Sequence, residues 1–233
     1  MRAVLLAAGL GTRLAPITDV IPKILAPLAG RPLLEYQLAY LARQGIGEVA
    51  INLHHRAEGV REFLAERDLP VAVRVSLEPA LLGTAGALHP LRDFISEPTV
   101  VLYGDVLTDA RLETLVAAHT GRGAAATLTY YTGPLAGKGS IELDPEQRVH
   151  RFVEKAESPP KAGYANAGLY VVSPMVLDYV RQGADFGHDV WPEMLAAGEP
   201  LYGHALDGYV RDIGSPDALA HAAADLSTGA LRW

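Results

Sequence analysis

The sequence contains no cysteine, which removes several kinds of chemistry at once. Without thiols there is no disulfide framework and no thiolate nucleophile. Long hydrophobic runs are also missing, since no apolar stretch approaches the roughly 20 residues of a membrane-spanning helix. The apolar run at residues 4–8 is too short for the core of a signal peptide and is typical of a strand. We therefore expect a cytoplasmic protein.

An excess of positive charge is missing as well. The chain has 20 Lys and Arg against 27 Asp and Glu, for a net charge of −7. This balance argues against nucleic acid as a partner, because nucleic-acid binders carry basic patches or a basic balance overall. Small phosphorylated ligands need only a local cluster of cations. With 233 residues and 49% hydrophobic content, the chain can build a substantial core in one large domain or two small ones.

A glycine-rich turn that follows an apolar strand, at residues 6–23, is the most informative stretch that is present. Gly9 and Gly11 let the backbone approach a ligand without interference from a β-carbon, and successive N–H groups then form an anion-binding concavity. Arg13 follows the turn and Lys23 lies ten residues further on, so two cations flank it. The pattern predicts a site for a polyphosphate.

Two other glycine-rich motifs fit this stretch less well. A dinucleotide-binding fold requires Gly-x-Gly-x-x-Gly and a later acidic residue on the second strand. Here Leu14 occupies the third glycine position, and the strand at 48–53 ends in Asn52-Leu53-His54-His55 without a carboxylate. A P-loop would need Gly-Lys followed by Ser or Thr, which is absent.

Alternating strand and helix patterns in the first half predict a parallel sheet. The expected strands there are 2–7, 48–53, 71–76, 99–103 and 124–131, and the expected helices are 33–44, 58–66, 84–91 and 110–120. Pro32 suits the first turn of the 33–44 helix, Gly45 suits its end, and Leu34, Leu38 and Leu41 share its apolar face.

The second half has a different pattern. Strands at 139–143 and 149–154 flank a turn at 144–147, and the other expected elements are strands at 167–173, 200–205 and 209–213, helices at 174–181 and 188–197, and a last helix capped by Ser215. The fold class that follows is α/β, a Rossmann-like, mostly parallel sheet sandwiched by helices, with a smaller α+β insertion in the second half.

Two carboxylates come at the ends of expected strands. Asp105 follows the apolar run Val100–Tyr103 and Gly104, and Asp212 follows the short strand near the C-terminus. Ligands of open parallel sheets lie outside the carboxyl ends of the strands. We therefore expect Asp105 and Asp212 to hold a magnesium ion that accompanies a triphosphate. The eight histidines show no zinc-site spacing, and we interpret His54 and His55 as loop contacts.

Six ordered blocks resemble the sugar-1-phosphate nucleotidylyltransferases, and in particular the mannose-1-phosphate and heptose-1-phosphate guanylyltransferases. The blocks cover essentially the whole chain: Gly9–Arg13 with Pro22-Lys23, 82–87, Gly104-Asp105, 152–155, Asn166–Gly168 and 212–216. The resemblance implies that a nucleoside triphosphate and a sugar 1-phosphate give a nucleotide-sugar and pyrophosphate. It also implies magnesium as the cofactor, and homo-oligomers are common in the family.

The resemblance assigns roles by motif. The catalytic residues would be Arg13, Lys23, Asp105 and Lys155. The nucleotide-binding residues would be Leu6, Ala7, Ala8, Gly9, Gly11, Thr12, Arg13, Glu78, Gly83 and Thr84. The sugar-phosphate would be held by Gly139, Glu154, Lys155 and Asn166, and the metal by Asp105 and Asp212. The whole chain would be one catalytic domain with a nucleotide-binding half at about 1–130, a sugar-phosphate-binding part at about 131–210 and a closing helix and tail at 211–233.

Specificity is expected to depend on Glu78, which falls in the base-reading loop of the family. A carboxylate only accepts hydrogen bonds, which suits the adjacent N1–H and N2–H₂ donors of guanine, so GTP is the expected donor. The alternative is that Glu78 is a loop charge that points at water. For the acceptor, Lys138 and Ser140 beside Gly139, and Arg211 before Asp212, depart from the pattern of many relatives. The alternative acceptors are therefore ordinary mannose, a heptose, another modified sugar and a sugar-like cyclitol phosphate.

Two other functions compete with this prediction. One is a thymidylyl- or uridylyltransferase that acts on glucose 1-phosphate. The other is a non-catalytic regulatory module that binds a nucleotide-sugar. The presence of Arg13, Lys23, Asp105, Lys155 and Asp212 argues against a pure binder, which has no need of a second metal carboxylate.

Overall fold

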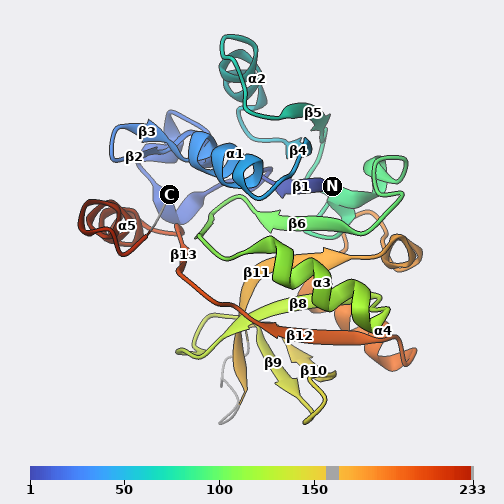
Figure 1. Ribbon diagram of the computed structural model, residues 1–233. Helices are drawn as coiled ribbons and strands as arrows, with labels where there is room; N and C mark the ends of the chain where they lie inside the picture. Colours follow the sequence, from blue (N-terminus) through green and yellow to red (C-terminus); the bar gives the residue numbers. More distant parts are fainter. Residues whose placement is uncertain (156–162, 232–233) are drawn as a thin grey trace. The chain divides into compact units, whose positions relative to one another are not determined.

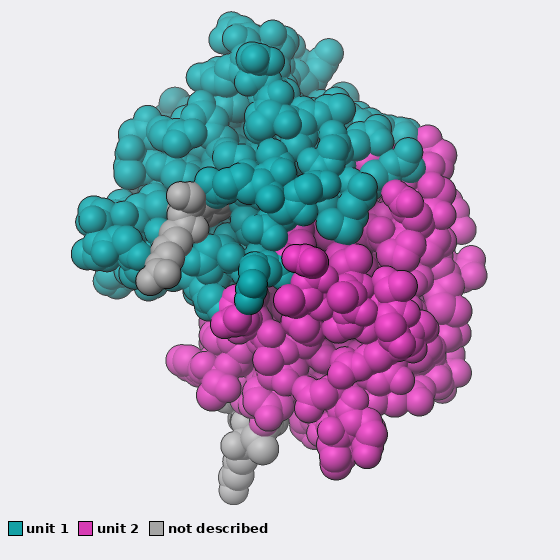
Figure 2. Space-filling view, in the orientation of Figure 1, with its two compact units in different colours: residues 1–81, 102–111, 208–233 teal, residues 82–101, 112–207 magenta. Residues whose placement is uncertain are grey.

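The chain forms a mixed α/β fold in which helices flank a mostly parallel sheet, as the sequence predicts (Figure 1). The computed structural model describes residues 1–155 and 163–231. Contacts divide it into two compact units (Figure 2). Unit 1 consists of Met1–Leu81, Leu102–Arg111 and Gly208–Trp233, and unit 2 of Leu82–Val101 and Leu112–Asp207. The predicted partition into functional parts stays a prediction.

Three parallel strands form the sheet of unit 1. They are β1 (Arg2–Leu6), β4 (Glu48–Leu53) and β5 (Ala72–Leu77), with Leu5 opposite Ile51 and Ile51 opposite Val75. The helices of this unit are α1 (Leu33–Arg43), α2 (Ala57–Ala65) and α5 (Pro216–Thr228). Ala3, Val4 and Leu5 are fully buried, which explains why this apolar run forms a strand.

The ends of two helices in unit 1 follow the sequence signals. Helix α1 begins directly after Pro32, and Gly45 beyond its end has φ +78°, the left-handed conformation that favours glycine. Ser215 caps α5, since its Oγ accepts from the Ala218 N–H at 3.2 Å. Both predictions are confirmed.

Short elements complete unit 1. They are the 3₁₀ turns η1 (Thr12–Leu14), η2 (Ile17–Asp19) and η3 (Lys23–Leu25) and the strands β2 (Pro27–Leu28), β3 (Arg31–Pro32), β7 (Val106–Thr108) and β13 (Val210–Asp212). Strand β13 pairs antiparallel with β7, with Asp212 opposite Val106. An apolar cluster that includes Leu14, Leu28 and Ile213 packs the first turn of the chain against α5. The sequence pattern did not predict β2, β3 or β7.

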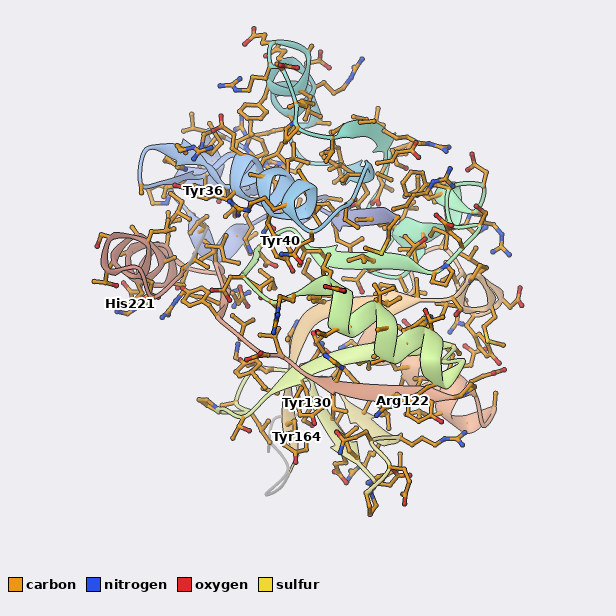
Figure 3. The ribbon with its side chains drawn as sticks, in the orientation of Figure 1. Tyr36, Tyr40, Arg122, Tyr130, Tyr164 and His221 are labelled. Carbon is orange, nitrogen blue, oxygen red and sulfur yellow. The ribbon has the colours of Figure 1, made fainter. Side chains whose placement is uncertain are left out.

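Unit 2 is built around antiparallel pairs. Its strands are β8 (Ala126–Tyr131), β9 (Ser140–Leu143), β10 (Val149–Val153), β11 (Tyr164–Val172) and β12 (Leu201–Ala205), and β6 (Thr99–Tyr103) carries the chain from unit 2 into unit 1. Strands β9 and β10 form the predicted hairpin, β11 pairs antiparallel with β8 and β9, and β12 pairs parallel with β8. Tyr130 on β8 and Tyr164 on β11 lie side by side, with ring centroids 4.4 Å apart (Figure 3).

The helices of unit 2 differ most from the prediction. They are η4 (Gly86–Leu91), α3 (Leu112–Arg122), η5 (Pro174–Asp178), the π-helix η6 (Phe186–Val190) and α4 (Trp191–Ala196). The expected helices at 84–91 and 174–181 are shorter 3₁₀ turns. Pro90 inside η4 lacks the N–H that an α-helix would use there. The expected helix at 188–197 is a π turn that continues into α4.

Candidate active site

The glycine-rich turn lies between β1 and η1 in unit 1. Gly11 has φ +68°, and a β-carbon there would lie 2.7 Å from Thr18 Cγ2 and 3.0 Å from Lys23 Cβ, so only glycine fits. Gly9 does not adopt a positive φ, but a β-carbon built on it would meet nothing within 4 Å. The turn therefore has one glycine required by conformation and one that leaves open space on an exposed surface.

Hydrogen bonds within unit 1 close this turn. Leu14 N–H donates to the Gly11 carbonyl at 2.8 Å, and the Thr18 hydroxyl donates to the same oxygen at 2.9 Å. Leu14, the residue at the third position of the dinucleotide fingerprint, is fully buried in the apolar cluster. Its side chain packs the turn against the core, and the exposed Thr12 and Arg13 lie beside it in η1.

A buried polar chain joins the turn to the expected base-reading residue. Asn52 Oδ1 accepts from the Ala7 N–H at 2.7 Å, and Asn52 Nδ2 donates to Glu78 Oε1 at 2.8 Å. The Glu78 side chain is 2% exposed, which excludes the interpretation that it points at water. His54 Nδ1 donates to the Glu78 carbonyl at 2.8 Å, a loop contact of the kind expected for this histidine.

Lys23 and Asp105 form an ion pair in unit 1, with Nζ and Oδ2 2.5 Å apart and side chains 14% and 25% exposed. Asp105 follows Gly104, which donates its N–H to the Leu6 carbonyl at 2.9 Å. A β-carbon at Gly104 would lie 2.7 Å from that same carbonyl oxygen. Glycine is therefore required for the backbone before Asp105 to approach the end of β1.

The second expected metal ligand lies on the neighbouring segment. Ile213 N–H donates to the Asp105 carbonyl at 2.7 Å, which places the backbone of Asp105 next to Asp212. A β-carbon at Gly214 would lie 2.9 Å from both Arg13 Nη2 and Asp212 Oδ1. The structure thus brings together Arg13, Lys23, Asp105 and Asp212, called the charge cluster below.

The donor set of the charge cluster fits a magnesium ion that enters with a nucleotide. Among residues 1–155 and 163–231, no group of three or more His, Asp or Glu side chains is arranged to hold a metal ion. Magnesium is commonly held by one or two carboxylates, substrate phosphates and water. Asp105 and Asp212 supply two carboxylates, and the assignment of the metal to them stays a prediction.

In unit 2, the motif at 82–87 packs on the chain at 181–184. Gly183 N–H donates to the Leu82 carbonyl at 2.8 Å, and the Gly86 N–H donates to the Ala184 carbonyl at 3.0 Å. Gly83 has φ +80°, and a β-carbon there would overlap the Ala184 carbonyl oxygen. Both glycines of the motif are therefore required by packing within the unit.

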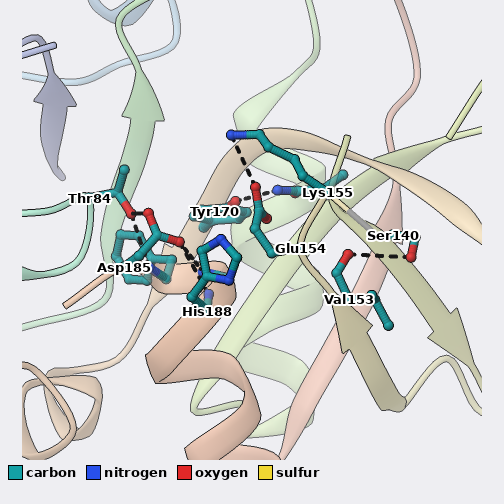
Figure 4. A network of polar contacts seen from close by, with 11 residues as sticks. Thr84, Ser140, Val153, Glu154, Lys155, Tyr170, Asp185 and His188 are labelled. Carbon is teal, nitrogen blue, oxygen red and sulfur yellow. Dashed lines mark hydrogen bonds and ion pairs between the residues drawn. The ribbon is translucent and has the colours of Figure 1, made fainter. Parts of the chain in front are cut away.

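Thr84, an expected nucleotide ligand, also supports unit 2. Its hydroxyl donates to Asp185 Oδ2 at 2.6 Å and accepts from the Phe186 N–H at 3.0 Å (Figure 4). Asp185 Oδ1 in turn caps η6, accepting from the N–H groups of Gly187 and His188 at 2.8 and 3.2 Å. Thr84 thereby fixes the start of the π-helix, and its role toward nucleotide stays a prediction.

The expected sugar-phosphate residues lie together in unit 2. A β-carbon at Gly139 would lie 2.8 Å from Glu154 Oε2, and one at Gly187 would overlap the same oxygen. Gly139, Glu154 and Gly187 are called the glycine box below. Asn166 N–H donates to the Gly139 carbonyl at 2.8 Å, which attaches β11 to the box.

Two polar side chains extend from the glycine box. Lys155 Nζ lies 3.2 Å from Glu154 Oε1 and is 63% exposed, and its backbone has φ +40° (Figure 4). Asn166 Nδ2 donates to the Tyr170 hydroxyl at 2.6 Å. A positive φ strains a non-glycine residue and persists only where the surrounding structure maintains it. Such strained residues are concentrated at functional sites.

A family model described as nucleotidyl transferase matches residues 2–229. The chain belongs to the nucleotidyl transferase family. Among curated relatives, the UTP–glucose-1-phosphate uridylyltransferase of Synechocystis is 33% identical, over 93% of this chain and 61% of that protein. The mannose-1-phosphate guanylyltransferase of Mycobacterium tuberculosis is 34% identical, over 97% of this chain and 65% of that protein. The crystal structure of HddC from Yersinia pseudotuberculosis is 26% identical, with a TM-score of 0.83 and coverage of 97% of this chain and 99% of that one.

The resemblance inferred from the sequence blocks is thus confirmed at the level of the family. The chain spans 61–65% of the length of the two curated relatives. The names of those two relatives give different nucleotides and different sugars. Family membership alone therefore does not identify the nucleotide or the sugar. In the part of the chain that the structure describes, no helix is long and apolar enough to cross a membrane.

The residues that depart from the pattern of many family members have partners in the structure. Ser140 is buried, and its hydroxyl donates to the Val153 carbonyl at 3.4 Å across the hairpin. Lys138 Nζ lies 5.8 Å from the centroid of the Tyr131 ring. Arg211 Nε donates to Asp225 Oδ2 on α5 at 2.9 Å and fixes β13 to that helix.

Tyr209 completes this attachment of β13. Its hydroxyl donates to Asp225 Oδ2 at 2.7 Å, and burial, together with this carboxylate, raises the pKa of Tyr209 to about 12. The phenol therefore stays protonated and keeps donating at neutral pH.

Sequence reasoning missed two residues of the site. Asn52 was noted only because it is not a carboxylate, yet it connects Ala7 with Glu78. Gly187 received no role, yet its missing side chain makes room for Glu154. The available signals were a polar residue in an apolar strand for Asn52 and a glycine just before an expected helix for Gly187.

Proposed function

We propose that this protein transfers a nucleoside monophosphate from a nucleoside triphosphate to a sugar 1-phosphate. A phosphate oxygen of the sugar 1-phosphate forms a bond to the α-phosphorus. The bond from that phosphorus to the oxygen bridging to the β-phosphate breaks, and pyrophosphate leaves with the electron pair. The observation that carries the proposal is the charge cluster beside the Gly11 turn, where two cations and two carboxylates meet in unit 1.

The turn and its two cations would hold the triphosphate. Gly9 leaves open space for phosphate oxygens, and the exposed N–H groups near Thr12 can donate to them. Arg13 and Lys23 would neutralise the charge that develops on the leaving pyrophosphate. The attacking phosphate is already largely ionised at neutral pH, because its second pKa is about 6, so no general base is required.

Asp105 and Asp212 would hold magnesium with the nucleotide. When bound, the ion supplies charge neutralisation at the phosphates. Lys23 forms an ion pair with Asp105, so the lysine is a second cation, beside the metal, that is oriented toward the same carboxylate. The lysine would then be placed to contact phosphate oxygens that share the metal.

The glycine box and its neighbours would hold the sugar 1-phosphate. Lys155 carries an exposed positive charge next to Glu154 and can bind the phosphate. The Glu154 carboxylate, 12% exposed and placed by two glycines, can accept hydrogen bonds from sugar hydroxyls, and the Asn166 amide can contribute further. We favour mannose 1-phosphate or a heptose or other modified sugar 1-phosphate as acceptor.

GTP is the donor that Glu78 favours. Its carboxylate is buried and accepts from Asn52, which supports an acceptor role toward the guanine N1–H and N2–H₂ groups. The similarity to a mannose-1-phosphate guanylyltransferase also supports GTP. The similarity to a UTP–glucose-1-phosphate uridylyltransferase supports a second candidate, a uridylyl- or thymidylyltransferase acting on glucose 1-phosphate.

A matrix of substrates tests the proposal. The purified protein is incubated with magnesium and each of GTP, UTP, dTTP, ATP and CTP against mannose, glucose and heptose 1-phosphates, and pyrophosphate is measured. We expect release only when both substrates and magnesium are present, fastest with GTP. A preference for UTP or dTTP would establish the second candidate, and nucleotide-sugar binding without turnover would establish the regulatory module instead.

A further inference from the structure

A fully buried glutamine in unit 1 holds the backbone on both sides of Asp105. Gln37 lies on α1, and its side chain is 0% exposed. Its Nε2 donates to the Gly104 carbonyl at 3.1 Å and to the Val106 carbonyl at 2.7 Å. These are the residues immediately before and after Asp105, so one amide group spans the turn that carries the carboxylate.

The orientation of this amide follows from its partners. Both carbonyl oxygens can only accept, so the NH₂ end of Gln37 must face them. The other end, Oε1, is buried and has no hydrogen-bond partner within the described residues. Leaving a buried carbonyl oxygen unpaired is unfavourable, and an apolar side chain at this core position would avoid it. Packing alone therefore does not account for a glutamine here.

The peptide between the two bonds is held from a second element. The Asp105 carbonyl accepts from the Ile213 N–H at 2.7 Å, and the Asp105 carboxylate pairs with Lys23 at 2.5 Å. The carbonyl groups of three consecutive residues, 104–106, are thus all engaged. The backbone that carries Asp105 is fixed relative to α1, and the same segment adjoins Asp212 on β13.

We propose that Gln37 is a positioning residue for the metal–nucleotide site, acting through the backbone of Asp105. This inference rests on the proposed function, in which Asp105 holds magnesium with the triphosphate. Groups that orient metal ligands typically change metal affinity or activity by about 10–100-fold when they are removed. The same range is expected for loss of the Gln37 amide.

The test compares Gln37→Met with Tyr40→Phe. Methionine fills a similar volume without donors. Tyr40 lies one turn further along α1 (Figure 3), is equally buried, and its hydroxyl donates to the Ala110 carbonyl at 2.8 Å, in the same segment but away from Asp105. Gln37→Met removes two buried hydrogen bonds and Tyr40→Phe removes one, in each case from the same helix to the same stretch of chain.

Three quantities are measured for the wild type and both variants: the affinity for Mn²⁺ in the presence of nucleotide, by electron paramagnetic resonance, the kinetic constants, and the melting temperature. We expect Gln37→Met to weaken Mn²⁺ binding and to lower kcat by about 10–100-fold, with KM for the sugar phosphate essentially unchanged, because the sugar-phosphate residues are not altered. Tyr40→Phe should lower the melting temperature comparably and leave Mn²⁺ binding and kcat within about twofold.

The result that overturns the inference is equal behaviour of the two variants toward Mn²⁺ and kcat. If Gln37→Met does not fold, Gln37→Asn decides, because it keeps the amide but is one methylene too short to reach both carbonyls. Failure of both to fold would assign Gln37 to the core and refute the inference. In an Asp105→Asn background, Gln37→Met should add no further loss of Mn²⁺ binding. A wild type that binds Mn²⁺–nucleotide but releases no pyrophosphate would refute the proposed function and leave the positioning role standing.

Discussion

The charge cluster of unit 1 and the glycine box of unit 2 fix their polar groups by opposite means. In the charge cluster, the Asp105 side chain forms an ion pair with Lys23, and its carbonyl accepts a hydrogen bond from Ile213. Gln37 donates to the carbonyls of the residues before and after Asp105. In the glycine box, Glu154 is held where two side chains are missing. The first arrangement depends chiefly on donors and charge, and the second chiefly on volume, although Lys155 also pairs with Glu154.

This difference shows how each region can be damaged. A substitution that keeps size but removes charge or a donor should affect the charge cluster strongly. A substitution that adds a single methyl group should affect the glycine box, whatever its polarity. The variants below include tests of this distinction and begin with the largest expected effect.

Asp105→Asn keeps the size of the side chain and removes its charge. We expect turnover to fall by at least about 10²–10³-fold, the range seen when one oriented electrostatic group is lost from a reaction centre. Circular dichroism and the melting temperature should remain close to those of the wild type. Near-normal turnover would remove Asp105 from the metal site.

Lys155→Ala removes the exposed cation beside the glycine box. We expect KM for the sugar 1-phosphate to rise by about 10–100-fold, since a charged hydrogen bond contributes about 1.5–3 kcal/mol, while KM for the nucleotide changes far less. Steady-state kinetics with each substrate varied in turn measures both constants. The opposite ranking would assign Lys155 to the nucleotide.

Gly187→Ala adds one methyl group where Glu154 Oε2 now lies. We expect Glu154 to be displaced and KM for the sugar 1-phosphate to rise about tenfold, because overpacking a close contact typically costs about 1–3 kcal/mol. Gly121→Ala, which places a methyl group in open space on α3, is the matched control. If both variants behave alike, the glycine box does not position Glu154.

Gly214→Ala is the counterpart in unit 1, since its β-carbon would lie 2.9 Å from groups of Arg13 and Asp212. The Arg13 side chain is exposed and can move, so this variant should be milder than Gly187→Ala, within about tenfold. The magnesium concentration for half-maximal activity should rise, with the sugar phosphate KM unchanged. A larger effect here than at Gly187 would contradict the distinction between the two regions.

Glu78→Gln exchanges an acceptor for a donor at constant shape. Asn52 Nδ2 can still donate to Oε1 of the new residue, so Nε2 takes the place of the other carboxylate oxygen. We expect the ratio of kcat/KM for GTP over UTP to fall about tenfold, since an unmatched polar group costs about 1–3 kcal/mol. An unchanged ratio would show that Glu78 does not read the base.

The smallest effect concerns the stability of unit 2 away from both regions. His119 is buried between Thr127 and Ser173, with each ring nitrogen 3.0 Å from a hydroxyl oxygen, and burial lowers its pKa. The native state favours the neutral form of His119. Its contribution to the free energy of unfolding is therefore complete above the unfolded pKa of about 6.5 and is lost as the pH falls below that value. We expect the melting temperature to fall more between pH 7.5 and 5.5 for the wild type than for His119→Gln. An equal fall would refute the assignment.

Sequence patterns predicted the helices and strands whose type depends on nearby residues. The strands at 48–53 and 99–103 have the predicted bounds, because each is a short apolar run between polar or turn residues. Leu34, Leu38 and Leu41 are buried on one face of α1 as expected. The prediction was least accurate at 84–91, where Pro90 lies inside a 3₁₀ turn, and at 188–197, where a π turn capped by Asp185 begins before residue 188.

The parts that could not be predicted depend on contacts between distant residues. Glycine is required at position 83 because Ala184 lies against it, and at position 187 because Glu154 lies against it. Local sequence does not reveal either of these neighbours. The motif blocks still indicated which side chains would meet, since they gave all members of the charge cluster. Gln37 had a local signal, because it is a polar residue among the leucines of an apolar helix face. Its partners, the carbonyls of Gly104 and Val106, are revealed only by the fold.

The way in which unit 1 is assembled from three stretches of chain has a consequence for the newly made protein. Asp105 lies in the second stretch and Asp212 in the third, and the whole of unit 2 is encoded before the third begins. During translation, domains fold as their residues emerge from the ribosome. The second carboxylate of the charge cluster is therefore synthesised only after all of unit 2. On the proposed assignment of the metal to Asp105 and Asp212, a polypeptide whose synthesis stops before residue 208 lacks one metal ligand and should not consume nucleoside triphosphate.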